Sequence, residues 1–141
     1  MNNSDWLALA AILVAALSAL YTRWAWSEAN KANKINLHSH KKEIYDAFFQ
    51  LKIYMGQKAD FAEKEHVHKF YYGSRSAHFY FCKEIADKLK KYFDQCLYIA
   101  DMNSTNLTGE QRIELVDKAK NAKSLSVEIE KLIFEDIKLN D

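Results

Sequence analysis

The sequence predicts an all-α protein with an N-terminal transmembrane helix that continues into a cytoplasmic antiparallel bundle of three to four helices. Two observations support this prediction. The 141-residue chain has no proline and only three glycines, so few residues interrupt a helix. After the first 26 residues, apolar side chains recur at spacings of three and four, which is typical of helices that bury one face. No alternating pattern of strands and no internal repeat is present.

The membrane segment is predicted from residues 6–22, WLALAAILVAALSALYT, which contain no charged residue. A helix from Trp6 to Trp26 rises about 30 Å, which matches the hydrocarbon thickness of a bilayer. Trp6, Trp24 and Trp26 lie where an aromatic belt is expected, and Arg23 can reach the lipid headgroups. These four residues form the predicted membrane interface, and membrane lipid is a predicted partner.

A cleaved signal peptide is the main alternative to a permanent anchor. The leader MNNSD has no basic residue, and the apolar run is longer than the core of a signal peptide. We therefore expect residues 1–26 to remain as the N-terminal segment and membrane anchor. Lysines and arginines follow the run and none precedes it, so the positive-inside rule predicts an outer N-terminus. Residues 27–141 would then form a cytoplasmic domain at a bacterial inner membrane.

The first part of this domain is predicted as a stalk helix over residues 27–56, in which Ile44, Phe48, Leu51 and Met55 follow helical spacing. The sequence leaves open whether one helix is continuous through residues 5–55. A short helix is predicted over 58–72. The later elements are a helix over 79–103, a helix over 108–133 and a tail over 134–141. The sequence leaves open whether residues 134–139 extend the last helix instead.

Two of these helices have a well-marked apolar face. That of the third helix comprises Cys82, Ile85, Leu89, Tyr92, Phe93, Cys96, and Ile99 or Ala100. That of the last helix comprises Ile113, Val116, Ala122, Leu125, Ile129 and Leu132. Thr108 and Gln111 are three apart, as in a capping box, and should begin the last helix. Cys82 and Cys96 are too far apart in one helix to form a disulfide, so we expect reduced thiols.

Small residues mark one face of the membrane segment: Ala8, Ala11, Ala15, Ser18, Ala19 and Thr22. Small side chains let two helix backbones approach closely, so this face is a candidate for self-association. The alternative is that an alanine-rich span contains such a face without consequence.

A Gly-Ser turn is predicted within residues 69–81, KFYYGSRSAHFYF, because a glycine and two serines interrupt an aromatic segment. Backbone amides there, with Arg75 and an aromatic ring, suit a small phosphorylated or nucleotide ligand. The candidate ligand-binding residues are Tyr72, Gly73, Ser74, Arg75 and Ser76. The alternative is a plain helix–helix turn whose aromatic neighbours fill the core.

Metal and cofactor sites are not predicted. His78 and Cys82 are four apart and are the best candidate pair of zinc ligands, but no HExxH or CxxC motif accompanies them. The histidines are better interpreted as surface or capping residues. No nucleophile elbow of the GxSxG type is present either.

Residues 24–49, WAWSEANKANKINLHSHKKEIYDAFF, resemble a pattern in small uncharacterised bacterial single-pass membrane proteins. The shared features are an Asn-rich helix after the span, an Ile-x-Leu-His segment and a Glu-Ile-Tyr-x-Ala-Phe helix. The matching positions are Asn30, Asn33, Ile35, Leu37, His38, Glu43, Ile44, Tyr45, Ala47 and Phe48. Residues 78–85, HFYFCKEI, resemble the start of the next long helix in those proteins. The resemblance implies the architecture given above and brings no established activity.

The functional hypothesis is a non-enzymatic, membrane-anchored interaction module that binds itself or a protein partner at the cytoplasmic face. The formal net charge of +1 gives no electrostatic indication of nucleic-acid binding. The second hypothesis is a ligand-gated oligomer that senses a nucleotide and perturbs the membrane in a defence or toxin context. A metal-dependent enzyme is the third.

Overall fold

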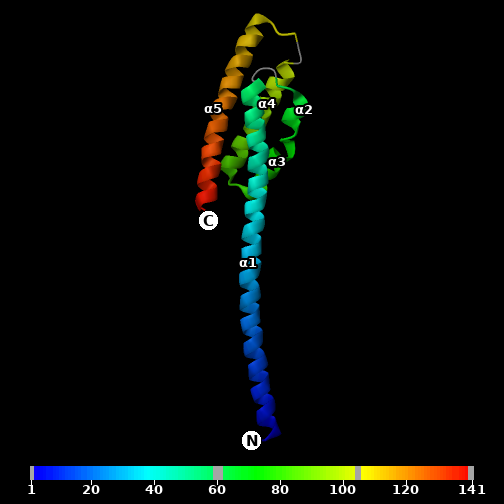
Figure 1. Ribbon diagram of the computed structural model, residues 1–141, viewed down its shortest axis with the longest axis vertical. Coiled ribbons are helices and arrows are strands. Elements are labelled where there is room, and N and C mark those ends of the chain that lie inside the picture. Colours follow the sequence, from blue (N-terminus) through cyan, green and yellow to red (C-terminus); the bar gives the residue numbers. More distant parts are fainter. Residues whose placement is uncertain (1, 59–61, 104–105, 140–141) are drawn as a thin grey trace. The chain divides into compact units, whose positions relative to one another are not determined.

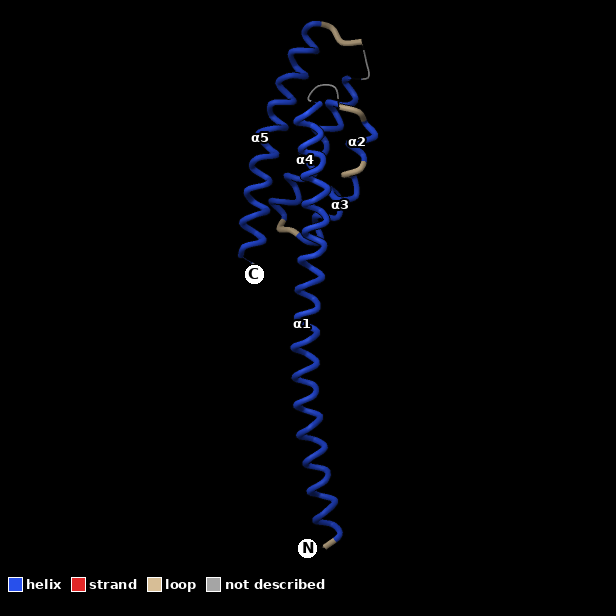
Figure 2. The backbone as a smooth tube through the Cα atoms, viewed as in Figure 1, coloured by secondary structure: helices blue, strands red, loops and turns tan. Residues whose placement is uncertain are grey.

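The computed structural model describes residues 2–58, 62–103 and 106–139. Within these ranges every regular element is helical, so the predicted all-α class is confirmed (Figures 1 and 2). The helices are α1 (Asn3–Lys58), α2 (Lys64–His68), α3 (Tyr71–Tyr80), α4 (Lys83–Asn103) and α5 (Gly109–Leu139). The chain divides into two compact units, Met1–Leu37 and His38–Asp141, which we call the N-terminal and C-terminal units.

Helix α1 is continuous over 56 residues, because its sequence has no proline and its single glycine lies in the last turn. At its start the Asp5 carboxylate accepts a hydrogen bond of 3.0 Å from the Asn2 N–H. This contact satisfies one of the backbone donors that a helix N-terminus leaves unpaired.

The N-terminal unit contains the apolar part of α1, which by length and composition could cross a membrane and has no buried residue in its most apolar stretch. Its hydroxyl groups are paired within the helix. Ser18 donates to the Val14 carbonyl and Thr22 donates to the Ser18 carbonyl, each at 2.8 Å. Such internal pairing is what a hydrocarbon environment requires of a polar side chain.

Helix α4 provides the centre of the C-terminal unit and packs against α2, α3 and α5. Its predicted apolar face is buried from Ile85 to Ala100, whereas Cys82 lies just before the helix and is exposed. From α1, Phe48 joins this core through an edge-on contact of 5.4 Å between its ring and that of Tyr92.

The prediction of one helix over 58–72 and another starting at residue 79 is wrong. The chain forms the short helix α2 and then α3, and residues 59–61 lie outside the described part. Phe81 has extended backbone angles, φ −112° and ψ 161°, and separates α3 from α4. Its side chain is buried, so core packing fixes this break.

Gly73 belongs to α3 rather than to a turn. A Cβ atom at this position would lie 2.8 Å and 2.9 Å from two atoms of the Phe70 ring. The glycine therefore allows a buried aromatic ring to pack directly on the helix backbone, a requirement that the sequence alone does not reveal.

Helix α5 begins with the predicted capping box. The Thr108 N–H donates to Gln111 Oε1 at 2.9 Å, and the Gln111 N–H donates to Thr108 Oγ1 at 3.4 Å. The helix continues to Leu139, so residues 134–139 extend it rather than form a separate tail.

The predicted apolar face of α5 is correct for Ala122, Leu125 and Ile129, which are buried. It is wrong for Ile113 and Val116, which are 67% and 43% exposed, because Leu115 occupies the buried position of this first part instead.

Candidate functional site

Helix α3 presents an exposed face formed by Tyr72, Arg75 and Phe79, which we call the α3 face. These residues follow the spacing i, i+3 and i+7, so they project from the same side of the helix. Tyr72 is 81% exposed and Phe79 is 82% exposed, more than any other large apolar residue described in the chain. Arg75 lies between them and also contacts the Tyr71 ring, with 5.5 Å from its guanidinium carbon to the ring centroid. Aromatic and arginine side chains are the types that dominate binding energy in protein interfaces.

The predicted ligand residues from Tyr72 to Ser76 are all helical, so the expected Gly-Ser turn is wrong. The Ser74 N–H donates to the Phe70 carbonyl at 2.9 Å, as in a continuing helix. The hydroxyl groups of Ser74 and Ser76 donate to the carbonyls of Tyr71 and Tyr72 at 2.7 Å and 2.8 Å. These amide and hydroxyl donors are used inside the helix. Phosphate binding there stays a prediction, without the open loop on which it was based.

His78 and Cys82 are both exposed. His78 lies near Asp87, with 3.9 Å between Nε2 and Oδ1. Over the residues that the structure describes, no three His, Cys, Asp or Glu side chains are grouped as a metal site would require.

The predicted membrane interface lies in the N-terminal unit. Trp6, Trp24 and Trp26 are 59%, 63% and 69% exposed, and Arg23 is exposed as well. The residues of the small-residue face are exposed as well: Ala8, Ala11, Ala15, Ser18, Ala19 and Thr22. Both sets of side chains are therefore available to lipid or to a second helix.

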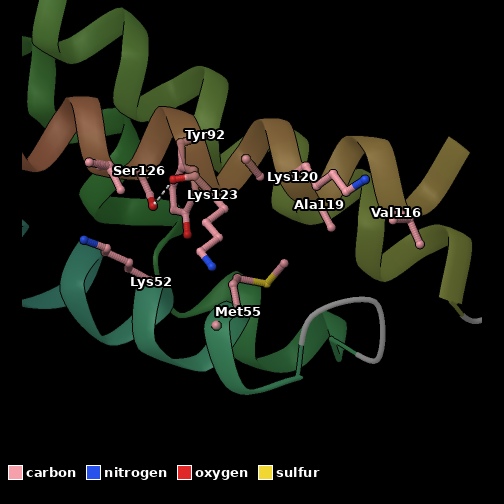
Figure 3. A pocket seen from close by; sticks show the side chains of 11 residues that line it. Lys52, Met55, Tyr92, Val116, Ala119, Lys120, Lys123 and Ser126 are labelled. Atoms are coloured by element: carbon pink, nitrogen blue, oxygen red, sulfur yellow. Dashed lines mark hydrogen bonds between the residues drawn. The ribbon is translucent and has the colours of Figure 1, made fainter.

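The C-terminal unit contains a pocket of about 370 Å³ between the end of α1 and the middle of α5, with α4 behind it (Figure 3). We call it the α1–α5 pocket. Apolar atoms line most of it: Met55, Tyr92, Val116, Ala119, Ala122 and Val127. Its charged lining residues are Lys52, Lys120 and Lys123, and no acidic residue lines it.

The side chains at this pocket come from both helices. Figure 3 shows Lys123 extending from α5 toward α1, and Met55 extending from α1 toward α5. Lys52 forms an ion pair with Glu130, which ties α1 to α5 beside the pocket. Lys123 has no ion-pair partner among the described residues.

The floor of the pocket is electrically neutral. Burial raises the pKa of the Tyr92 hydroxyl above its usual range, and burial raises the pKa of the nearby Cys96 thiol to about 12. Both groups are therefore protonated at neutral pH. The Ser126 hydroxyl donates to the Lys123 carbonyl at 2.7 Å. The Ser126 hydroxyl is thus already paired, and the charge of the site comes from the lysines.

The sequence alone does not indicate this pocket, because its walls come from residues 52–56 of α1, Tyr92 of α4 and residues 116–127 of α5, which are distant in the chain. A weak signal is present in α5. Ala119, Ala122 and Ser126 place small side chains where a packed helix would carry larger ones, and lysines stand between them.

Comparison with known proteins gave no match: no family model, no curated protein and no solved structure is significantly similar to this chain.

Proposed function

We propose that this protein is a membrane-anchored, non-enzymatic interaction module that binds a protein partner or a second copy of itself through the α3 face. The single observation that supports this proposal is the exposure of Tyr72 and Phe79 on either side of Arg75. Large aromatic side chains that are more than four-fifths exposed leave apolar surface in contact with water. Burial of that surface against a partner would be energetically favourable.

The location is part of the proposal. The apolar segment of α1 would cross a bacterial inner membrane once, with Trp6 near one interface and Arg23, Trp24 and Trp26 near the other. The basic residues that follow the segment would keep the C-terminal unit in the cytoplasm. In this arrangement the membrane anchor confines the C-terminal unit, with its α3 face, to the cytoplasmic side of the membrane. A partner anchored in the same membrane would then encounter the α3 face at a high local concentration.

We also propose that the C-terminal unit is an antiparallel helical bundle. Lys41 of α1 pairs with Asp136 near the end of α5, whereas Lys52, further along α1, pairs with Glu130, earlier in α5. This order of contacts supports opposite directions for the two helices. The small-residue face of the membrane segment would add a second route to self-association.

Photo-crosslinking in cells tests the proposed function. A photo-activatable amino acid at position 76, beside the α3 face, should crosslink the full-length protein to itself or to a reproducible partner. The double variant Tyr72→Ala/Phe79→Ala should abolish that crosslink, because it removes the aromatic contact area.

The matched control is Ile113→Ala, which truncates an apolar side chain that is 67% exposed on α5. It should leave the crosslink intact. The proposal fails if the unmodified face gives no reproducible crosslink, or if the double variant and the control behave alike.

A further inference from the structure

We propose that the α1–α5 pocket is a binding site for a small amphipathic anion: an apolar chain with a single carboxylate or phosphate head. This inference is independent of the α3 face and concerns other helices. It is based on the size, the lining and the charge of the pocket.

The size of the pocket suits a small organic ligand. Its volume of about 370 Å³ is at the lower end of the range of roughly 300–1,000 Å³ found for ligand sites in proteins. The lining is concave and apolar, with the Tyr92 ring behind and small side chains at Ala119 and Ala122. An apolar chain placed there would displace water from these walls.

The positive charge around the pocket favours an anionic group at the other end of the ligand. Lys52, Lys120 and Lys123 stand around an opening that no carboxylate lines. Lys52 and Lys120 have acidic neighbours, Glu130 and Asp117, the second at 3.9 Å. Lys123 lacks such a neighbour within the described ranges and extends over the gap between α1 and α5 (Figure 3). An anionic head would pair with Lys123 first.

The floor argues against a polar or multiply hydrogen-bonded ligand. The Ser126 hydroxyl is paired with the Lys123 carbonyl at 2.7 Å, which leaves the Tyr92 hydroxyl as the one other uncharged polar side-chain group of the lining. A sugar or a nucleobase would bury several polar groups against a floor that offers few partners, which is costly. An alkyl chain has no such groups, so its insertion leaves nothing unpaired.

The same chemistry is found in a free carboxylate and in an anionic lipid of the bilayer. The probe is therefore a diazirine derivative of decanoate, used with the full-length protein in nanodiscs of zwitterionic lipid. After irradiation, mass spectrometry should find the label on the peptides around Met55 and around residues 116–127. Unlabelled decanoate should compete for the site.

Two variants and one control test the assignment. Ala119→Phe fills the apolar part of the pocket, and Lys123→Glu reverses the charge at its opening. Each variant should reduce labelling at the site about tenfold. This reduction is expected when the ligand loses one charged contact, or when its apolar chain loses the space in which it binds. Lys131→Glu changes another exposed lysine of α5 that does not line this pocket, and it should have no effect.

A matched diazirine derivative of decanol gives the decisive comparison, because it has the same chain without the charge. The proposal is supported if decanol labels the site about tenfold less than decanoate. It is overturned if the two label equally, or if Ala119→Phe leaves labelling unchanged. Circular dichroism of each variant verifies that the helices are intact.

Nanodiscs that contain phosphatidylglycerol distinguish the two sources. Competition by this lipid would identify the bilayer as the source of the anion, and undiminished labelling would identify a free carboxylate. Either result keeps the site. Failure of the proposed interaction module would not affect these measurements, since the α3 face is not part of the pocket.

Discussion

Lys41 of α1 and Asp136 of α5 form an ion pair with 2.5 Å between Nζ and Oδ2, although 95 positions separate them in the chain. The Lys41 side chain is only 8% exposed and lies over the Phe81 ring, 5.4 Å from its centroid. A lysine so deeply buried is rare unless it is paired. The pair therefore fixes where the first and last helices of the C-terminal unit meet.

Replacing Lys41 should destabilise the C-terminal unit more than the loss of a surface ion pair would. Lys41→Met removes the ammonium group from this mostly buried ion pair, and we expect the free energy of unfolding to fall by about 2 kcal/mol. Urea unfolding followed by circular dichroism measures this change.

The double variant Lys41→Met/Asp136→Leu removes both charges and should recover most of the lost stability. Lys120→Met is the control within the same unit, since Lys120 pairs with Asp117 on the exposed surface of α5 and should contribute less than about 1 kcal/mol. Equal effects of Lys41→Met and Lys120→Met would contradict this account.

Gly73 and Gly56 should respond in opposite directions to alanine. Alanine at position 73 would bring a Cβ within 3 Å of the Phe70 ring, which is buried and held by its neighbours. We expect Gly73→Ala to lower the free energy of unfolding by about 1–3 kcal/mol through overpacking.

A Cβ at Gly56 meets no atom within 4 Å, so Gly56→Ala should stabilise the last turn of α1 by about 0.5–1 kcal/mol. Thermal unfolding of both variants against the parent compares the two positions. If both variants raise the midpoint, then Phe70 is free to move and the packing argument is wrong.

These positions illustrate how far the sequence alone could predict the fold. The capping box of Thr108 and Gln111 was predictable, because both partners lie within one turn of helix. The apolar face of α4 was also predictable, because its residues recur at helical spacing within one continuous segment. Gly73 was mistaken for a turn residue, since the need for a glycine arises from a ring that packs on it and not from its own backbone angles.

The candidate sites were harder to predict because they depend on contacts between distant segments. The α1–α5 pocket requires Lys52 and Lys123 to stand at the same opening, and no local pattern relates them. The sequence identifies Tyr72 as a candidate but not Phe79, because the exposure of both depends on which side of α3 faces the core. The spacing of residues in the sequence identifies one face of a helix. It does not show whether that face contacts the core, solvent or a partner.

The two cysteines should differ sharply in reactivity. Cys82 is exposed, whereas Cys96 is buried, and its burial raises the pKa of the Cys96 thiol to about 12. Since the thiolate is the reactive form, Cys96 should remain unmodified at neutral pH in the folded protein.

A thiol-specific dye should therefore label one thiol per chain in buffer and two in denaturant. Cys82→Ser should abolish labelling in buffer and leave one thiol in denaturant. Rapid labelling of two thiols without denaturant would show that the core around Tyr92 opens readily.

A charge in the centre of the apolar segment should prevent stable membrane insertion. Leu13 is exposed within a stretch of α1 that has no acidic or basic residue, and lipid would cover it in the proposed arrangement. Leu13→Arg adds about 2.5–3.5 kcal/mol to the cost of insertion at a helix centre. We expect the full-length variant to move largely from the membrane fraction to the soluble or aggregated fraction.

Ile35→Arg is the control, because Ile35 is exposed to a similar degree but lies beyond Trp26. The Ile35→Arg variant should stay membrane-bound. Intact mass measurement of the membrane-bound parent distinguishes an anchor from a signal peptide, since cleavage would remove the segment. A parent protein that is soluble, or a cleaved product, would overturn the proposed location while leaving the fold of the C-terminal unit untouched.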